Sequence, residues 1–297
     1  MLRIGLFLLT NLAVIAVASV TLKLLGVEHY LQGSELNLTS LLIFCAIFGF
    51  AGSLISLFIS KWMAKRSTGV KIITSASTSD ERWLVETTRS LSDTAGIGMP
   101  EVGIFPAPES NAFATGWNRN NALIAVSEGL LQRFTRDEVR AVLAHEIGHV
   151  ANGDMITLSL IQGVVNTFVM FFARIIGHTV DKVIFKNERG HGIGFYIATF
   201  VAEMILGVLA SIIVMKFSRY REYRADVAGA TLADRGSMIN ALKRLSSEQK
   251  AQMPSSMPDT MAAFGISSGF SKRNLGKLFA SHPPLEDRIR ALQQKMT

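Results

Sequence analysis

Cysteine is almost absent from this chain of 297 residues. Cys45 is the single cysteine, so no intramolecular disulfide can form, and a small secreted scaffold held together by disulfides is excluded. Extensive disorder is also excluded, because 18 Phe, 12 Met and many aliphatic residues supply ample apolar surface to bury. The length suits one large domain or two ordinary ones.

Charge is also scarce. Charged residues make up 18% of the chain, against about 25% in soluble proteins. Four windows account for the deficit, because together they contain one charged residue, Glu203, and the remaining chain has the ordinary soluble fraction, about a quarter. The windows are residues 4–22, 36–60, 155–173 and 192–215.

Each window is long enough to cross a bilayer as a helix. Four transmembrane helices are therefore expected; a helix buried in a soluble core is the alternative, and it has more weight for the last two windows. The first window also imitates a secretory signal, because Ala-Val-Ala at 16–18 resembles a cleavage site. Its length and the Lys23 that ends it favour an uncleaved anchor.

Basic residues predict the orientation of these helices. The connection at 27–35 has two acids and no Lys or Arg, whereas the second window is followed by Lys61, Lys65, Arg66 and Lys71. By the positive-inside rule, the N-terminus and the chain from Lys61 onward start in the cytoplasm. The connection at 174–191 has four basic and two acidic residues, which leaves open whether the second hairpin spans the membrane fully, is re-entrant or packs on the protein.

The segments between the windows have an α+β pattern. Thr135 and Glu138 form a capping box that opens a helix through Asn152. After Met215 a helix is expected to continue through Ala233, residues 249–271 are typical of a loop, and a final helix is expected beyond Pro284. A further helix is expected at 79–91, and strands are expected at 101–105, 111–115 and 122–126.

These patterns divide the chain into four regions. Two transmembrane helices fall in residues 1–60, and a second apolar hairpin falls in residues 155–215. The cytoplasmic parts are residues 61–154 and 216–297. We find no internal repeat and no low-complexity run.

The string His145-Glu146-Ile147-Gly148-His149 is the most informative in the sequence. Its two histidines at i and i+4 share one face of the expected helix, so both imidazoles can reach one Zn²⁺, while Glu146 projects nearby to take a proton from the attacking water. A chance HExxH is the alternative, but the chain has only 6 His and the motif falls on a predicted helix. The string therefore predicts a zinc hydrolase.

A catalytic zinc needs a third protein ligand. Glu222 and Asp226, at i and i+4 after the fourth window, are the candidates, with Asp226 placed to accept a hydrogen bond from a ligand histidine. The alternative is a solvated helix face with neighbouring arginines as ion-pair partners. An antiparallel apolar hairpin would return Glu222 to the side of His149. Poorer ligand candidates lie in that hairpin or its connection: His178, His191 and Glu203.

Several strings together resemble one family. The chain resembles the HtpX-type membrane metalloproteases, bacterial relatives of the CAAX prenyl proteases, over essentially its whole length. The resemblance rests on two N-terminal spans, HEIGH at 145–149, a hydrophobic hairpin, SRYREYRAD at 218–226 and SHPPLEDR at 281–288. It implies an α+β membrane protein with a mainly helical, gluzincin-type metalloprotease domain and a small sheet.

The resemblance also implies roles for the metal-site residues. His145, His149 and Glu222 match the family's zinc ligands, for one Zn²⁺ per chain. Glu146 matches the general base, and Asp226 matches the carboxylate that supports a ligand.

Further matches concern the substrate. Asn111, Ala112 and Phe113 match a motif on the edge strand that holds the substrate, and His282 and Arg288 match positions thought to line the active site and steady the oxyanion. Without the resemblance, Asn111 would pass as a turn residue, His282 as a helix-entry histidine and Arg288 as a surface arginine.

The implied function is a zinc-dependent endopeptidase of the bacterial cytoplasmic membrane, with its protease part in the cytoplasm, that acts on misfolded or damaged membrane proteins under stress. The partners expected are protein substrates and the lipid bilayer, and an oligomer is left open. The net charge of +7 fits an anionic leaflet better than nucleic acid, because the basic residues cluster beside spans and no nucleic-acid motif appears.

Three other functions are weighed against this one. A prenyl-protein-processing protease shares the zinc chemistry, but such relatives usually have more spans. A non-catalytic zinc scaffold would need ligands but no base, and Glu146 is present. A transporter or channel using Glu203 as a coupling acid would need more polar residues in its spans than these windows have.

Overall fold

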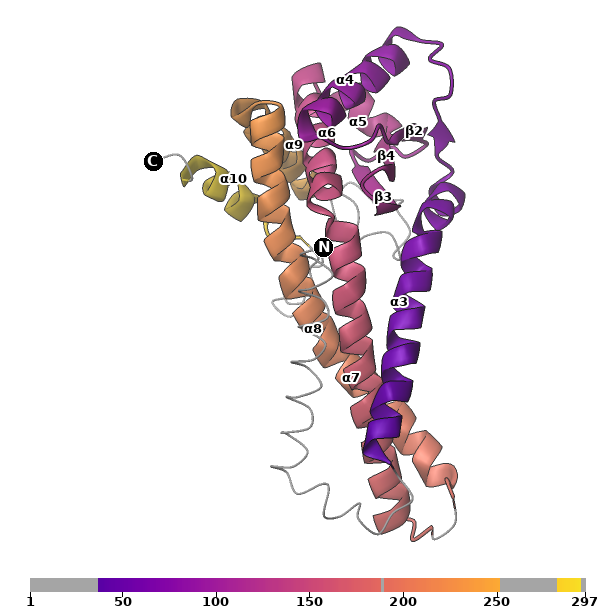
Figure 1. Ribbon diagram of the computed structural model, residues 1–297. Coiled ribbons are helices and arrows are strands. Elements are labelled where there is room, and N and C mark those ends of the chain that lie inside the picture. Colours follow the sequence, from indigo (N-terminus) through magenta and orange to yellow (C-terminus); the bar gives the residue numbers. More distant parts are fainter. Residues whose placement is uncertain (1–36, 188–189, 252–281, 295–297) are drawn as a thin grey trace. The chain divides into compact units, whose positions relative to one another are not determined.

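We describe a computed structural model of the chain, which places residues 37–187, 190–251 and 282–294 (Figure 1). The first apolar window and most of the expected loop at 249–271 lie outside these residues. The helices in the described part are α3 (Leu38–Thr68), α4 (Ser79–Ala95), α5 (Glu128–Arg133), α6 (Arg136–Asn152), α7 (Asp154–Val183), α8 (Ile193–Leu232), α9 (Arg235–Lys250) and α10 (Leu285–Gln294).

One small mixed sheet has the order β1-β2-β4-β3. β2 (Glu101–Phe105) and β4 (Asn121–Ser127) run parallel, while β1 (Lys71–Ile72) and β3 (Ala112–Asn118) pair antiparallel with their neighbours. The three strands expected from the sequence are present, and β2 has the expected bounds. β3 occupies an edge of the sheet in the described part of the chain, as the substrate-strand expectation requires.

Both faces of the sheet are covered. In β4, Ala122, Ile124 and Val126 belong to the larger apolar core, which includes residues of α4 and α6, while Leu123 and Ala125 belong to a smaller core on the other face. Figure 1 shows α4, α5 and α6 close to the strands. A strand buried on both faces has a nearly continuous apolar sequence, which explains why β4 lacks the alternation of a half-exposed strand.

Capping boxes set the starts of two helices in this part. Thr78 caps α4 with Glu81, and Thr135 caps α6 with Glu138, each through a reciprocal pair of side chain to backbone hydrogen bonds. α6 ends at Gly153, whose φ of 66° is left-handed, a conformation that glycine adopts at little cost. α7 begins at the next residue.

Three helices, α3, α7 and α8, are long and apolar enough to cross a membrane. α7 contains the third apolar window, and α3 and α8 contain all but the first residues of the second and fourth. The structure corrects one boundary. The sequence placed a connection at 174–191, but α7 extends into this segment and ends at Val183. Arg174 lies within that helix and its NH1 approaches Glu203 Oε1 at 3.3 Å. The pairing neutralises the one acid of the fourth window.

The chain divides into two compact units. In the described residues, one unit comprises 37–54 and 160–210, and the other comprises 55–159 and 211–294. The described part of the first unit holds segments of α3, α7 and α8 and the connection between α7 and α8. The second holds the sheet and every candidate site residue, so the site can be described within one unit.

Candidate metal centre and active site

The candidate metal centre lies where α6 and α8 pack closely together. A Cβ added at Gly148 would lie 2.6 Å from the Cβ of Ala228, and one added at Gly229 would lie 3.3 Å from the backbone nitrogen of His145. Only small residues permit this approach. It brings the carboxylate of Glu222 on α8 to the two histidines of α6.

Three potential ligand atoms converge there. His145, His149 and Glu222 each offer one ligand atom, all within 4.8 Å of one another. The Nε2 atoms of the two histidines are 3.2 Å apart, and Nε2 of His149 is 3.3 Å from Glu222 Oε1. Glu222 is 1% exposed, so the solvated-face alternative is wrong for it.

The other nitrogen of each histidine is held by an acid. His145 Nδ1 is 3.0 Å from Asp226 Oδ1, as expected from the sequence, and His149 Nδ1 is 2.7 Å from Asp154 Oδ2. A proton held on each Nδ1 leaves both Nε2 lone pairs directed at the Glu222 carboxylate. Three acceptors so close together repel one another, unless protons or a cation lie among them. The geometry therefore suits a bound metal ion.

Asp154 was not predicted from the sequence. The sequence did contain a signal for it. Asp154 lies five residues after His149 and directly after Gly153, which caps the end of the helix, so its carboxylate can turn back toward the imidazole. The burial of Arg221 was not predicted either. It is 5% exposed and donates a hydrogen bond to Ser218.

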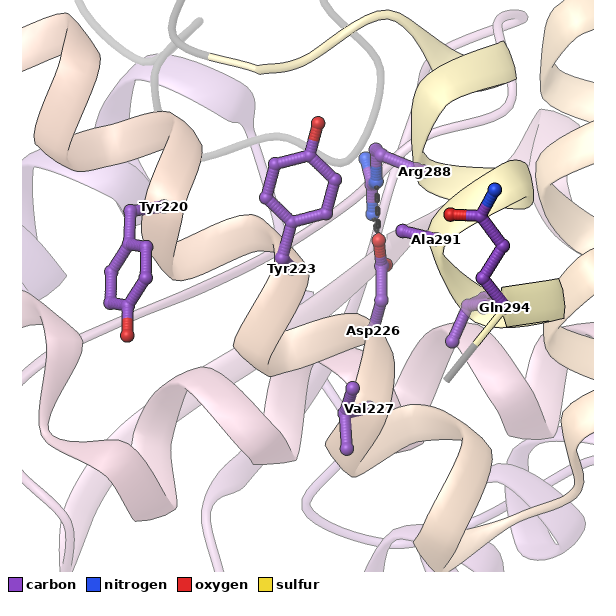
Figure 2. Close-up of a pocket in the computed structure, with 8 residues that line it drawn as sticks. Tyr220, Tyr223, Asp226, Val227, Arg288, Ala291 and Gln294 are labelled. Carbon is purple, nitrogen blue, oxygen red and sulfur yellow. Dashed lines mark hydrogen bonds and ion pairs between the residues drawn. The ribbon is translucent and has the colours of Figure 1, made fainter. Parts of the chain in front are cut away.

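Arg288 closes the other side of the centre. It is fully buried, and its Nε and NH2 donate to the two oxygens of Asp226 at 2.8 and 2.6 Å (Figure 2). Its NH1 is 3.4 Å from Glu222 Oε2. The reading of Arg288 as a surface arginine is therefore wrong. Such a bidentate buried pair fixes Asp226, and through it the ring of His145.

His282 meets the same glutamate. Its Nδ1 is 2.7 Å from Glu222 Oε2, and its side chain is 7% exposed. Its Nε2 is buried and has no hydrogen-bond partner in the part of the chain that the structure describes. Nδ1 also makes no hydrogen bond to the described residues, so its short separation from Glu222 is an ion-pair contact only.

Burial and charge set the protonation of the site. Burial raises the pKa of the Glu146 carboxyl, which is 1% exposed. Burial alone would lower the pKa of His149, but the Glu222 carboxylate and the Asp154 hydrogen bond outweigh it and raise that pKa to about 10. A raised carboxyl pKa suits a residue that must accept and return a proton.

The expected substrate strand lies at the start of β3. Asn111 is fully buried, its carbonyl accepts from the Ser127 backbone N–H at 2.9 Å, and its backbone N–H donates to Ser127 Oγ at 2.9 Å. Phe113 packs against Phe105 in the smaller core, with ring centroids 5.5 Å apart. The side chain of Phe113 therefore points into the protein interior. Because Asn111 faces β4, the backbone groups of Ala112 face the opposite edge.

A pocket of about 380 Å³ adjoins the Asp226–Arg288 pair (Figure 2). It is mainly apolar and does not include the three candidate ligands. Its lining residues come from α8 and α10: Tyr220, Tyr223, Asp226, Val227, Arg288, Ala291, Leu292 and Gln294.

Comparison with known proteins supports the chemistry of the site. Residues 78–296 match the model of "Peptidase family M48". The chain belongs to peptidase family M48. It is 70% identical to "Protease HtpX" of Cellvibrio japonicus (strain Ueda107) over 99% of this chain and 98% of that protein. It is 68% identical to "Protease HtpX" of Hahella chejuensis (strain KCTC 2396), over 98% and 99% of the two chains.

A solved structure shares the fold. The crystal structure of S. mikatae Ste24p matches with a TM-score of 0.62 at 19% identity, over 96% of this chain and 66% of that one. This M48 peptidase is a membrane metalloprotease, as the sequence predicted, and it acts on protein substrates. The full-length relatives named Protease HtpX do not favour the prenyl-processing alternative.

Proposed function

We propose that this M48 peptidase is a zinc-dependent endopeptidase of the bacterial cytoplasmic membrane, with residues 61–154 and 216–297 in the cytoplasm, and that it hydrolyses misfolded or damaged membrane proteins. The observation that carries the proposal is the convergence of two imidazoles and one carboxylate whose outer atoms are held by Asp154, Asp226 and Arg288.

The ligand set fits zinc. Zn²⁺ bound by nitrogen at about 2.0–2.1 Å in a tetrahedron places neighbouring ligand atoms about 3.3–3.4 Å apart. The separations of His149 Nε2 from His145 Nε2 and from Glu222 Oε1 are 3.2 and 3.3 Å. Two histidines and a glutamate are also a ligand set of catalytic zinc, with a fourth position left for water or substrate. When bound, zinc would polarise the scissile carbonyl and make water more acidic.

The protein's own residues supply the proton transfers. Glu146 follows the first ligand directly, and its buried carboxylate takes a proton from the attacking water and passes one to the leaving amine. His282 donates from its spare Nε2 to the oxyanion that develops on the substrate carbonyl. Arg288 places positive charge beside Glu222 and fixes Asp226.

Substrate would bind as an added strand along β3, beginning at Asn111-Ala112-Phe113. Main-chain bonds to the outer edge of β3, which the backbone carbonyl of Ala112 faces, would give affinity with little side-chain preference. The side chain of Phe113 is packed in the smaller core, and the Ala112 N–H donates to Asn111 Oδ1 at 2.9 Å. Loose preference suits the removal of damaged proteins. The basic segments beside the apolar windows support the cytoplasmic orientation.

The test compares the wild type with Glu146→Ala after purification in detergent with zinc. Each is incubated with an unfolded soluble protein and with a membrane protein. Asp137→Ala, in the exposed first turn of the same helix, is the matched control and should cleave like the wild type. We expect Glu146→Ala to lose at least a hundredfold in rate; equal cleavage by Glu146→Ala and the wild type would refute the mechanism.

A further inference from the structure

Exposed aromatic side chains gather where β3 ends. The ring of Trp117 lies 5.8 Å, centroid to centroid, from the ring of Phe58 on α3. Trp62 lies one helical turn beyond Phe58, on the same face of α3. The exposed fractions of Phe58, Trp62 and Trp117 are 57%, 64% and 40%. We call these three residues the aromatic cluster.

The hairpin that carries Trp117 is fastened to α3. Lys61 Nζ donates to Asn121 Oδ1 at 2.6 Å, at the start of β4, and lies 3.0 Å from Glu101 Oε1 at the start of β2. Lys65 pairs with the same glutamate. These contacts fix the β3–β4 turn at the level of Lys61, the first residue after the second apolar window.

The turn itself is polar and cationic. Residues 119 and 120 connect β3 to β4, and Arg119 is exposed. Trp117 and Arg119 are thus an aromatic and a cation placed two residues apart. Tryptophan is enriched at membrane–water interfaces, and arginine is attracted by anionic headgroups.

Three environments can surround the aromatic cluster: water, a protein partner or a lipid bilayer. Leaving such side chains in water forgoes the favourable free energy of burying their apolar surface. A bilayer is the occupant that the neighbouring residues favour, because Phe58 belongs to a candidate membrane span and basic residues follow it at once. We infer that the β3–β4 hairpin is a membrane-interface anchor, with the aromatic cluster at the boundary of headgroups and acyl chains and Arg119 among the headgroups.

This placement, which rests on the proposed function, identifies the substrate class more closely. A strand bound along β3 would have one end at the lipid surface, near Trp117, and the other near Asn111. Six residues separate these positions, about 20 Å at roughly 3.3 Å per residue. The polypeptides favoured are therefore segments that leave a membrane-embedded stretch and extend about six residues or more into the cytoplasm.

Fluorescence can test the anchor without proteolysis. The chain has three tryptophans, and Trp83 on α4, whose ring lies 5.3 Å from the Arg136 guanidinium carbon, is the internal control. Full-length variants that keep one tryptophan, with phenylalanine at the other two positions, are reconstituted into vesicles of phosphatidylcholine and phosphatidylglycerol. Lipids brominated near the headgroup end or deep in the acyl chain serve as quenchers.

We expect shallow bromines to reduce the Trp117 emission at least twofold, deep bromines to reduce it less, and neither to affect Trp83. Trp117 emission quenched no more than that of Trp83 would overturn the anchor and assign the cluster to protein docking. Because the measurement needs no catalysis, its failure would leave the proposed zinc chemistry standing, and an inactive enzyme would leave it readable.

Cleavage tests the substrate class. Trp62→Ser and the conservative Trp62→Phe, on α3 and outside the substrate strand, are compared on an unfolded soluble protein and on a membrane-anchored reporter with cytoplasmic spacers of two to twelve residues. We expect Trp62→Ser to cleave the anchored reporter at least fivefold more slowly, with less than a twofold change on the soluble protein, and Trp62→Phe to retain most activity on both. Equal losses on both substrates would overturn entry from the interface.

Discussion

His145 and His149 direct their Nε2 atoms at each other across 3.2 Å, while a carboxylate holds the opposite nitrogen of each ring. Two lone pairs at this distance would repel, so a proton or a metal cation must lie between the two nitrogens.

Removing the third candidate ligand should release the metal. We expect Glu222→Ala, loaded with zinc and dialysed, to retain well below one zinc per chain by atomic absorption, because two histidines alone hold zinc weakly. Asp137→Ala should retain one. Full retention by Glu222→Ala would mean that another residue completes the site.

Asp154 should act through His149. Losing the acid that orients a ligand histidine typically weakens metal binding 10–100-fold. We therefore expect Asp154→Asn to raise the zinc dissociation constant by that factor in competition with a chelator, with cleavage at saturating zinc largely recovered. Asp137→Asn serves as the control, and an unchanged constant in Asp154→Asn would remove Asp154 from the site.

Breaking the buried Asp226–Arg288 pair should destabilise the protein. Truncating one partner leaves an uncompensated buried charge, at a cost of about 3–5 kcal/mol in the free energy of unfolding. We expect Arg288→Met to lower the melting temperature in detergent by more than the double variant Asp226→Asn with Arg288→Met, which buries no lone charge. A double variant no more stable than Arg288→Met would contradict this account.

Zinc affinity should rise with pH. The pKa of His149 is raised to about 10 in the metal-free site, so the imidazole is protonated at pH 7, and zinc must displace that proton. For one displaced proton, the apparent dissociation constant falls about tenfold per pH unit below the raised pKa. Chelator competition between pH 6.5 and 8.5 measures this slope, and a constant value across the range would show that no proton is displaced.

Adding a methyl group to α6 should disturb its contact with α8, and removing a methyl group from α8 should restore that contact. A methyl group at Gly148 would meet the Cβ of Ala228 at 2.6 Å, and overpacking of this kind costs about 1–3 kcal/mol. We expect Gly148→Ala to weaken zinc binding and lower the melting temperature, and Ala228→Gly in the same chain to restore much of both. Failure of the second change to rescue the first would place the strain elsewhere.

Local signals predicted the elements of this fold well. Thr135 and Glu138 fixed the start of α6 because a capping box is a contact between residues three apart, and β2 is bounded by Pro100 and Pro106. β1, two residues long, went unpredicted, since pairing with β2 rather than its own sequence makes it a strand. α5 and α9 were also missed.

The site was predicted less evenly. HEIGH predicted two candidate ligands and a candidate base because their spacing is helical, whereas the contact of α6 with α8 depends on small residues far apart in the sequence. The burial of Arg288 depends on α10 reaching Asp226 across 62 positions. Without the family resemblance, its sequence context suggested only a surface arginine.

The distance along the chain between the candidate ligands has a consequence for biosynthesis. Glu222 follows His149 by 73 positions, with α7 and the apolar part of α8 between them. A nascent chain that has emerged only as far as α7 therefore holds two of the three candidate ligands and lacks Glu222. The candidate metal centre is complete only after the apolar part of α8 has been synthesised, so metal binding there must follow the synthesis of both helices.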